Sequence, residues 1–152
     1  SGSLGELYSL LLNATRLSGT LPPQFGLFGR KLRDLSLAAT ALSGTLPARL
    51  TEMQRLVRLA AHSAQLSGTL PAELAQLTML SGLALFSNRL SGSLPAEMAA
   101  LGKLDTCALT RSQASLGATS GNSNSFACPL PDEALPSACS GLECSPQLPA
   151  PP

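Results

Sequence analysis

The sequence predicts an α/β repeat fold: a right-handed solenoid with short parallel strands on its concave face and short helical or 3₁₀ segments on its convex face. Three observations lead to this prediction. The hexapeptide LSGTLP occurs at residues 17–22, 42–47 and 66–71, and LSGSLP follows at 90–95. The glycine of the hexapeptide recurs in steps of 25, 24 and 24 residues. Alternating leucines precede each copy and helix-spaced apolar residues follow it, and such units are stable only when they stack on one another.

The segment before each hexapeptide predicts a short strand. Its leucines alternate with small or polar residues, which places the leucines on one side of the strand. Three columns of the aligned repeats carry them: Leu7, Leu32, Leu56 and Leu80; Leu10, Leu35, Leu59 and Leu83; and Leu12, Leu37, Ala61 and Leu85. Stacked copies would form a parallel sheet whose leucines face inward.

The hexapeptide and the residues after it predict a bend and then the convex segment. We interpret the hexapeptide as a spacer: Leu42 and Leu46 point inward, and its glycine tolerates unusual φ values. The proline sets the beginning of a helical turn. Apolar residues three positions apart follow each proline: Phe25 and Phe28, Leu50 and Met53, Leu74 and Leu77, and Met98 and Leu101.

The full pattern, LxxLxLxxNxLSGxLPxxLxxLxxL, resembles the plant-type leucine-rich repeat over roughly residues 4–112. The repeat sequence is also similar to that of leucine-rich surface proteins of protists and algae. The family carries Asn after the strand, where its amide satisfies backbone groups along the stack. That column here reads Thr15, Thr40, Ala64, Asn88 and Ser112. Because Ala64 has no polar side chain, we expect the third repeat to be locally weakest unless the backbone or water compensates.

The chain divides into three parts. Residues 1–112 hold about four full repeats, with a partial repeat at the start and a fifth strand at 104–109. Residues 113–144 predict an irregular cap that contains cysteines, and 145–152 predict a proline-rich linker. The chain opens in the middle of a repeat without a polar cap, so we expect it to be a piece of a larger array.

The cysteines predict one disulfide in the cap. Many plant-type arrays end in a short segment with two paired cysteines, and this resemblance implies that Cys128 pairs with Cys139 or Cys144. We expect Cys107, which lies in a leucine column, to be a free, buried thiol. Four cysteines allow three connectivities. A metal site is the alternative, but CxxC pairs are absent, and we expect no metal; the clustered cysteines favour an oxidising, extracellular compartment.

Composition excludes several classes of function. Ten Lys and Arg against nine Asp and Glu give a net charge of +1, so the chain lacks the basic field that nucleic acid requires. The densest basic stretch, residues 30–33, is interpreted as a solvated turn. No apolar run reaches the roughly 18–20 residues of a membrane span, so we expect no membrane insertion within this chain. His62 is the only histidine, and neither a catalytic set nor a phosphate loop accompanies it, so we expect no enzyme and no cofactor.

The outward residues of the strands predict a concave binding face. In repeat phase they form four rows: Ser9, Asp34, Arg58, Gly82 and Thr106; Leu11, Ser36, Ala60, Ala84 and Ala108; Asn13, Ala38, His62, Phe86 and Thr110; and Ala14, Ala39, Ser63, Ser87 and Arg111. The candidate binding residues are Asp34, Arg58, His62, Phe86, Thr110 and Arg111. Phe86 is interpreted as a solvent-facing contact anchor, with lateral packing as the alternative. Asp34 and Arg58 could instead pair with each other across adjacent strands.

The resemblance to receptor-like kinase ectodomains and to polygalacturonase-inhibitor-type proteins implies a non-catalytic interaction module. Such a module would be secreted or at the cell surface and would bind a protein, a peptide or a cell-wall polysaccharide on its concave face. A structural wall or coat protein is the alternative. A remote alternative is ice binding by a hydroxyl ladder of Thr20, Thr45, Thr69 and Ser93 at the roughly 4.8 Å strand spacing. Asn13 begins a glycosylation sequon, Asn-Ala-Thr, which could also arise by chance.

Overall fold

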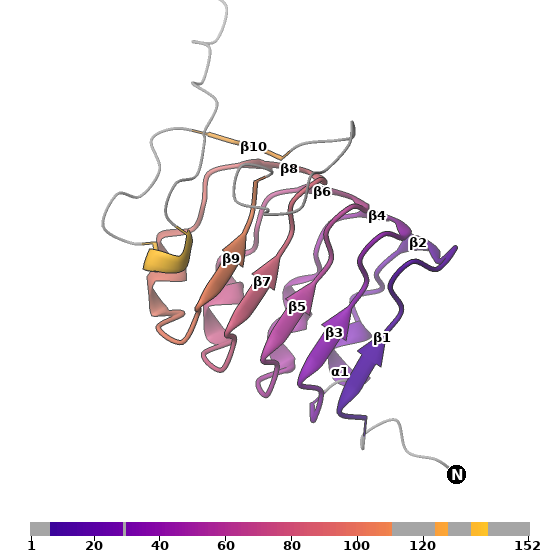
Figure 1. Ribbon diagram of the computed structural model, residues 1–152, viewed down its shortest axis with the longest axis horizontal. Helices are drawn as coiled ribbons and strands as arrows, with labels where there is room; N and C mark the ends of the chain where they lie inside the picture. Colours follow the sequence, from indigo (N-terminus) through magenta and orange to yellow (C-terminus); the bar gives the residue numbers. More distant parts are fainter. Residues whose placement is uncertain (1–6, 29, 111–123, 128–134, 140–152) are drawn as a thin grey trace, which may run out of the picture.

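The computed structural model describes residues 7–28, 30–110, 124–127 and 135–139, and in them it confirms the predicted solenoid (Figure 1). Each repeat adds one strand to a five-stranded parallel sheet on the concave side. Its strands are β1 (Ser9–Leu11), β3 (Asp34–Ser36), β5 (Arg58–Ala60), β7 (Gly82–Ala84) and β9 (Thr106–Ala108). The register aligns each residue with its equivalent in the next repeat, so the first two predicted rows of the concave face are confirmed.

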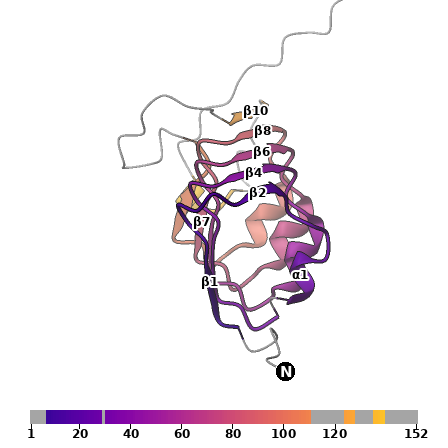
Figure 2. The same cartoon turned by 90° about the vertical axis from the view of Figure 1, so that its right-hand side faces the viewer.

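The hexapeptide forms a second parallel sheet, so its interpretation as a mere spacer is incomplete. The strands of this sheet are β2 (Ser18–Thr20), β4 (Ala41–Gly44), β6 (Gln65–Gly68), β8 (Arg89–Gly92) and β10 (Ser125–Phe126). Stacking brings this segment of each repeat beside that of the next, and the extended backbones pair with a shift of two positions, so that Ser43 lies opposite Gln65. Figure 2 looks along the solenoid and shows the first sheet, the second sheet and the helical segments on three sides of the core.

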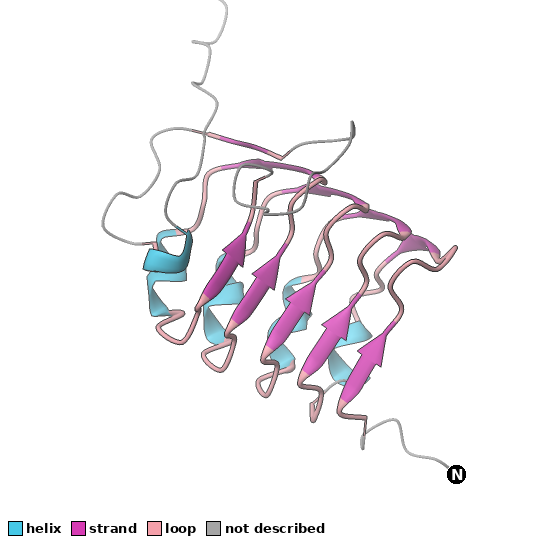
Figure 3. Cartoon of the chain, in the orientation of Figure 1, coloured by secondary structure: helices cyan, strands magenta, loops and turns pink. Residues whose placement is uncertain are grey.

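Short helical segments close the convex side, as predicted (Figure 3). They are α1 (Phe25–Phe28), η2 (Ala48–Glu52), η3 (Ala72–Gln76) and η4 (Ala96–Ala100). Each 3₁₀ segment starts after an extended proline, such as Pro47 with φ −70° and ψ 133°. The carbonyl of Pro47 accepts a hydrogen bond from the N–H of Leu50 at 3.0 Å, which closes the first turn. Leu50 and Met53 then point into the core and are each 1% exposed.

The predicted leucine columns fill the core between the two sheets and the convex segments. Leu35, Leu59 and Leu83 are at most 2% exposed. Burying each such side chain is worth roughly 1.5–3 kcal/mol, as an upper estimate. Leu10 occupies the same column but is only partly buried, because β1 is an edge strand of its sheet in the described part of the chain. Each repeat therefore depends on its neighbours for burial.

Asn88 joins the third and fourth repeats through the backbone. It is fully buried, and its Oδ1 accepts a hydrogen bond from the N–H of Leu66 at 3.1 Å. Its Nδ2 donates to the carbonyls of Ala61 and Leu85, both at 2.8 Å. The fourth repeat thus supplies the side-chain partner for the third, and the expected weakness moves one repeat earlier: Ala64 has no acceptor to offer the N–H of Leu42, the equivalent of Leu66.

Asn124 takes the place in the asparagine column that the sequence pattern assigned to Ser112, which lies outside the described residues. Its Oδ1 accepts from the N–H of Leu90 at 2.9 Å, and its Nδ2 donates to the carbonyls of Leu85 and Leu109 at 2.8 and 2.7 Å. Asn124 follows Asn88 by 36 residues rather than 24, so twelve additional residues precede it. The solenoid resumes with β10 inside the segment that was expected to be an irregular cap.

The disulfide differs from the expected pairing. Cys107 is bonded to Cys139, with the two Cα atoms 4.9 Å apart. The expectations of a free thiol at Cys107, and of Cys128 as a partner of Cys139, are therefore wrong; Cys128 and Cys144 lie outside the described residues. The physical reason is positional. Cys107 occupies the leucine column of β9, the last strand of its sheet, and η6 (Ser137–Cys139) packs against that strand where a further repeat would lie.

The glycine and threonine of the hexapeptide fit each other between repeats. Gly44, Gly68 and Gly92 have φ near +79°, a region that favours glycine. A Cβ at Gly68 would lie 2.8 Å from Cγ2 of Thr45, and the same relation holds at the two other glycines. The threonine methyl of one repeat therefore occupies the space beside the glycine of the next.

Gly68→Ala is expected to destabilise the protein by about 1–3 kcal/mol, because it combines a strained φ with this methyl clash. Gly19→Ala is the matched control: Gly19 also has a positive φ, of 93°, but nothing lies within 4 Å of its would-be Cβ. Urea unfolding should show the larger loss for Gly68→Ala, and adding Thr45→Ser should recover part of it. Equal losses for the two glycine variants would show that the methyl contact is unimportant.

Candidate binding face

Arg58 and Asp34 form an ion pair across β5 and β3, as the alternative interpretation of the first row stated. Arg58 Nη1 and Asp34 Oδ1 lie 3.5 Å apart. The side chains are 74% and 37% exposed, so the pair adds at most about 1 kcal/mol to stability. The pair holds the guanidinium of Arg58 beside Asp34, and Arg58 lies on β5, the central strand of the concave sheet.

Two hollows flank this ion pair. The first, of about 360 Å³, is lined by Arg58, Leu59, Ala60, Gly82, Leu83, Ala84, Thr106, Cys107 and Ala108. The second, of about 350 Å³, is lined by Ser9, Leu11, Asp34, Leu35, Ser36, Arg58 and Ala60. Arg58 and Ala60 border both hollows, so the concave face is a shallow trough interrupted by one charged pair.

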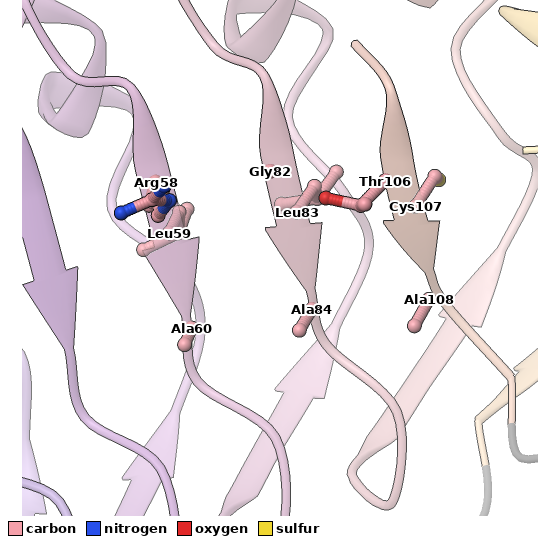
Figure 4. A pocket seen from close by; sticks show the side chains of 9 residues that line it. All are labelled: Arg58, Leu59, Ala60, Gly82, Leu83, Ala84, Thr106, Cys107 and Ala108. Atoms are coloured by element: carbon pink, nitrogen blue, oxygen red, sulfur yellow. The ribbon is translucent and has the colours of Figure 1, made fainter. Parts of the chain in front are cut away.

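Gly82 creates the first hollow. Figure 4 shows it on β7 between Arg58 on β5 and Thr106 on β9, above a row of three alanines. A Cβ on Gly82 would lie 3.1 Å from Oγ1 of Thr106 and 3.5 Å from Cγ of Arg58, so any side chain would begin to fill the space. Gly82 was not among the predicted site residues. The signal in the sequence was that the first row contains one residue without a side chain.

Two side chains of the third row, His62 and Phe86, stack on each other. The rings of His62 and Phe86 lie 4.4 Å apart at an interplanar angle of 5°. Phe86 is only 7% exposed, so the expectation that it faces solvent is wrong and the lateral-packing alternative is confirmed. His62 and Phe86 lie two residues after the ends of β5 and β7, where the spacing between repeats still matches that of paired strands and lets two flat rings stack. Thr110, the next candidate in this row, is also buried, and Arg111 lies outside the described residues.

The protonation of His62 makes the stability of the fold depend on pH. Burial removes water from its imidazolium form and lowers the pKa of His62 below 6.5. The unfolded chain therefore takes up the proton first as the pH falls, so stability is lost from about pH 6.5 down to the lowered pKa of the folded state.

The free energy of unfolding of the wild type is accordingly expected to fall more steeply between about pH 7.5 and pH 5 than that of His62→Tyr. Tyrosine keeps a ring against Phe86 but has no titration in this range. Urea unfolding at a series of pH values measures both profiles. Parallel profiles would contradict the assignment of the pH dependence to His62, the only histidine of the chain.

The fourth row turns the chain towards the second sheet. Ala14, Ala39, Ser63 and Ser87 all have φ of 54–56°, the left-handed region. Ser87 is buried, and its Oγ has no hydrogen-bond partner, whereas Ser63 is exposed. This row therefore provides turn geometry, and Ala14, Ala39 and Ser63 are exposed at these turns.

Two further predicted sites lie away from the concave trough. Asn13 and Thr15 of the sequon are both exposed, so the sequon is accessible, and its glycosylation stays a prediction. The four hydroxyls of the proposed ladder, at positions 20, 45, 69 and 93, are exposed beside the second sheet. Because the threonine methyls also pack against the glycines of the next repeat, interlocking of repeats accounts for these threonines without any ligand.

In the parts of the chain that the structure describes, no helix has the length and apolar character needed to cross a membrane. Among the same residues, no group of three or more His, Cys, Asp or Glu side chains is arranged to hold a metal ion.

Several solved plant receptor structures share this architecture. The plant peptide hormone receptor RGFR1 in complex with RGF2 is 29% identical, with a TM-score of 0.70, over 85% of this chain and 22% of that one. The Arabidopsis receptor kinase HAESA, in complex with the peptide hormone IDA and the co-receptor SERK1, is 27% identical, with a TM-score of 0.67, over 81% and 18%. The BIR2 ectodomain from Arabidopsis thaliana is 29% identical, with a TM-score of 0.66, over 81% and 58%.

This chain thus spans less than two thirds of the length of each of these structures. No protein-family model matches it, and neither does any curated protein.

Proposed function

Since this chain is a plant-type leucine-rich-repeat protein, we propose that it is a non-catalytic module that binds a peptide or an extended protein segment on its concave face. Two of the similar structures are complexes of receptors with peptide hormones, RGF2 and IDA. We extend that kind of partner, and not those particular hormones, to this chain.

The hollow over Gly82 is the observation that carries this proposal. A trough floored by Ala60, Ala84 and Ala108 lets the backbone of a ligand approach the sheet closely. Arg58 stands at its margin, with most of its side chain in solvent, and its fork of donors suits a carbonyl or a carboxylate. Small floor residues and one directional charged group are typical of a surface that binds an extended chain.

An extracellular location and the absence of catalysis belong to the same proposal. The disulfide between Cys107 and Cys139 supports an oxidising compartment. His62 Nδ1 lies 3.3 Å from Oγ of Ser63, the one contact that resembles a nucleophile and its base. Among the described residues no carboxylate is hydrogen-bonded to His62 to orient it, and its ring is stacked on Phe86, so this pair is better explained as packing.

The test is a selection of peptides from a random library on the wild-type protein, followed by affinity measurements on two matched variants. Ala84→Arg puts a long side chain into the trough, and Ala72→Arg puts the same side chain on the exposed convex side. Ala84→Arg is expected to lower the affinity for the selected peptides by about tenfold or more, roughly 1.4 kcal/mol, and Ala72→Arg is expected to leave the affinity unchanged. Failure to select any peptide, or equal affinities for the two variants, would contradict the proposal.

A further inference from the structure

A third hollow lies away from the concave trough. It measures about 420 Å³ and is lined by Arg30, Glu52, Gln54 and Arg55. Glu52 is the last residue of η2, and the other three belong to the loops that lead from α1 and η2 back to the strands of the first sheet, loops that Figure 3 shows along one edge of the solenoid. We refer to it as the edge hollow.

The additional residue of the first repeat falls at this edge. Three residues separate Phe28 from Leu32, whereas two residues separate Met53 from Leu56, and the later repeats also have two. The longer loop contains Arg30, and the shorter loop of the next repeat contains Arg55. The irregularity of 25 rather than 24 residues thus coincides with two exposed arginines lining one hollow.

The edge hollow also lies in the most basic part of the chain. Residues 30–58 contain six Arg and Lys but only two acidic residues. Both acidic residues are already in ion pairs, Asp34 with Arg58 at 3.5 Å and Glu52 with Arg49 at 3.9 Å. The other described charges balance, with three basic and three acidic residues. The positive excess of the described residues therefore lies in residues 30–58, the stretch that supplies all four lining residues of this hollow.

The chemistry of the lining selects for a carboxylate. Two guanidinium groups offer paired N–H donors that match the two oxygens of a carboxylate, and the amide of Gln54 offers one more donor. The carboxylate of Glu52 lies in the same lining, which penalises a dianion such as phosphate more than a singly charged group. Among the described ion pairs, none involves Arg30 or Arg55, so their charge is available to a ligand.

We propose that the edge hollow binds an acidic segment of a protein partner, with Asp or Glu carboxylates between Arg30 and Arg55. This deepens the proposed function by adding a second contact region, and it rests on that function for the class of partner. The edge hollow and the trough are linked along the chain: Arg55 lies three residues before Arg58, which borders the trough. A peptide on the concave face could therefore continue to this edge.

The experiment is a titration of the protein with hexaglutamate at about 0.15 M salt, where charges more than about 8 Å away are largely screened. Arg30→Gln combined with Arg55→Gln is expected to weaken binding by about tenfold or more. Arg16→Gln combined with Arg89→Gln removes the same net charge from exposed arginines outside the basic stretch and is expected to change binding by less than about twofold. Matching unfolding curves for the two double variants would confirm that each is folded.

Three results would overturn the inference: no binding of hexaglutamate to the wild type, equal losses in the two double variants, or tighter binding of an oligogalacturonate of the same charge. The last would assign the edge hollow to a polysaccharide. Ala84→Arg separates this test from that of the concave face, because it is expected to leave hexaglutamate binding unchanged. Failure of the trough and failure of the edge hollow can therefore be told apart.

Discussion

Replacing Asn88 with alanine is expected to lower the free energy of unfolding by about 2–4 kcal/mol. The side chain is fully buried and makes hydrogen bonds to Leu66, Ala61 and Leu85. Its loss removes the side-chain partner of the N–H of Leu66 and of the carbonyl of Ala61 in the interior, whereas the carbonyl of Leu85 keeps its hydrogen bond from Asn124. Each unsatisfied group costs about 1–3 kcal/mol, and water entering the space offsets part of this. Urea denaturation measures the total.

Thr40→Ala is the matched control for this variant. Thr40 occupies the same column and is also buried, but its Oγ1 donates one hydrogen bond, at 2.8 Å, to Leu37 of its own repeat. Its replacement is expected to cost about 1 kcal/mol. Hydrogen exchange adds a local readout, since the amide of Leu66 should lose protection in Asn88→Ala. If Asn88→Ala costs no more than Thr40→Ala, the bridge between repeats is not a major source of stability.

Removing the disulfide by the double replacement Cys107→Ala and Cys139→Ala is expected to cost about 3–4 kcal/mol. The two cysteines are 32 residues apart, and closing a loop of this length restricts the unfolded chain by about that amount. The double variant is preferable to a single one because a lone thiol could exchange with Cys128 or Cys144. Urea unfolding of the oxidised proteins gives the difference.

The loss should also be localised. Stability in a stacked array is a sum over neighbouring interfaces, so the amides of β9 should exchange faster in the double variant while those of β3 change little. Peptide mapping of the wild type checks the premise, because a digest should contain Cys107 linked to Cys139. A digest that links Cys139 to Cys128 instead would contradict the structure.

The repeat period and the inward leucines could be predicted because they depend only on spacing. A residue such as Leu59 is buried wherever the copies stack, so its column alone gave its place. The second sheet was missed because nothing in LSGTLP alternates like a strand. Its pairing arises only after stacking places Ser43 and Gly44 beside Gln65 and Leu66 of the next repeat. Prediction of strands from the alternation of apolar residues cannot detect pairing that depends on stacking.

The end of the array escaped prediction because its phase is broken. Twelve additional residues hide the match between Asn88-Arg89-Leu90 and Asn124-Ser125-Phe126, although the spacing within each triplet is the same. The pairing of Cys107 was missed for a related reason, since its partner arrives from a segment outside the repeat pattern. At Phe86 the signal was present: His62 occupies the equivalent position of the preceding repeat, and flat rings in adjacent repeats can stack.

The sequence predicted which residues share a row of the concave face, but not where the face is hollowed. Arg58 and Asp34 could be selected as candidates by their charge. Gly82 could not, because a residue without a side chain forms a hollow only where larger side chains, here Arg58 and Thr106, flank it. The edge hollow was also missed, since residues 30–33 looked like a solvated turn. Its two arginines come together only when the first and second repeats stack.

The central claim is that the trough over Gly82 binds an extended peptide, and amide chemical-shift mapping by NMR tests it most directly. Titrating the isotopically labelled protein with a peptide selected on the wild type should give the largest shifts in β5, β7 and β9, centred on Gly82. Shifts concentrated in the second sheet, or in η2 and η3 on the convex side, would contradict the claim.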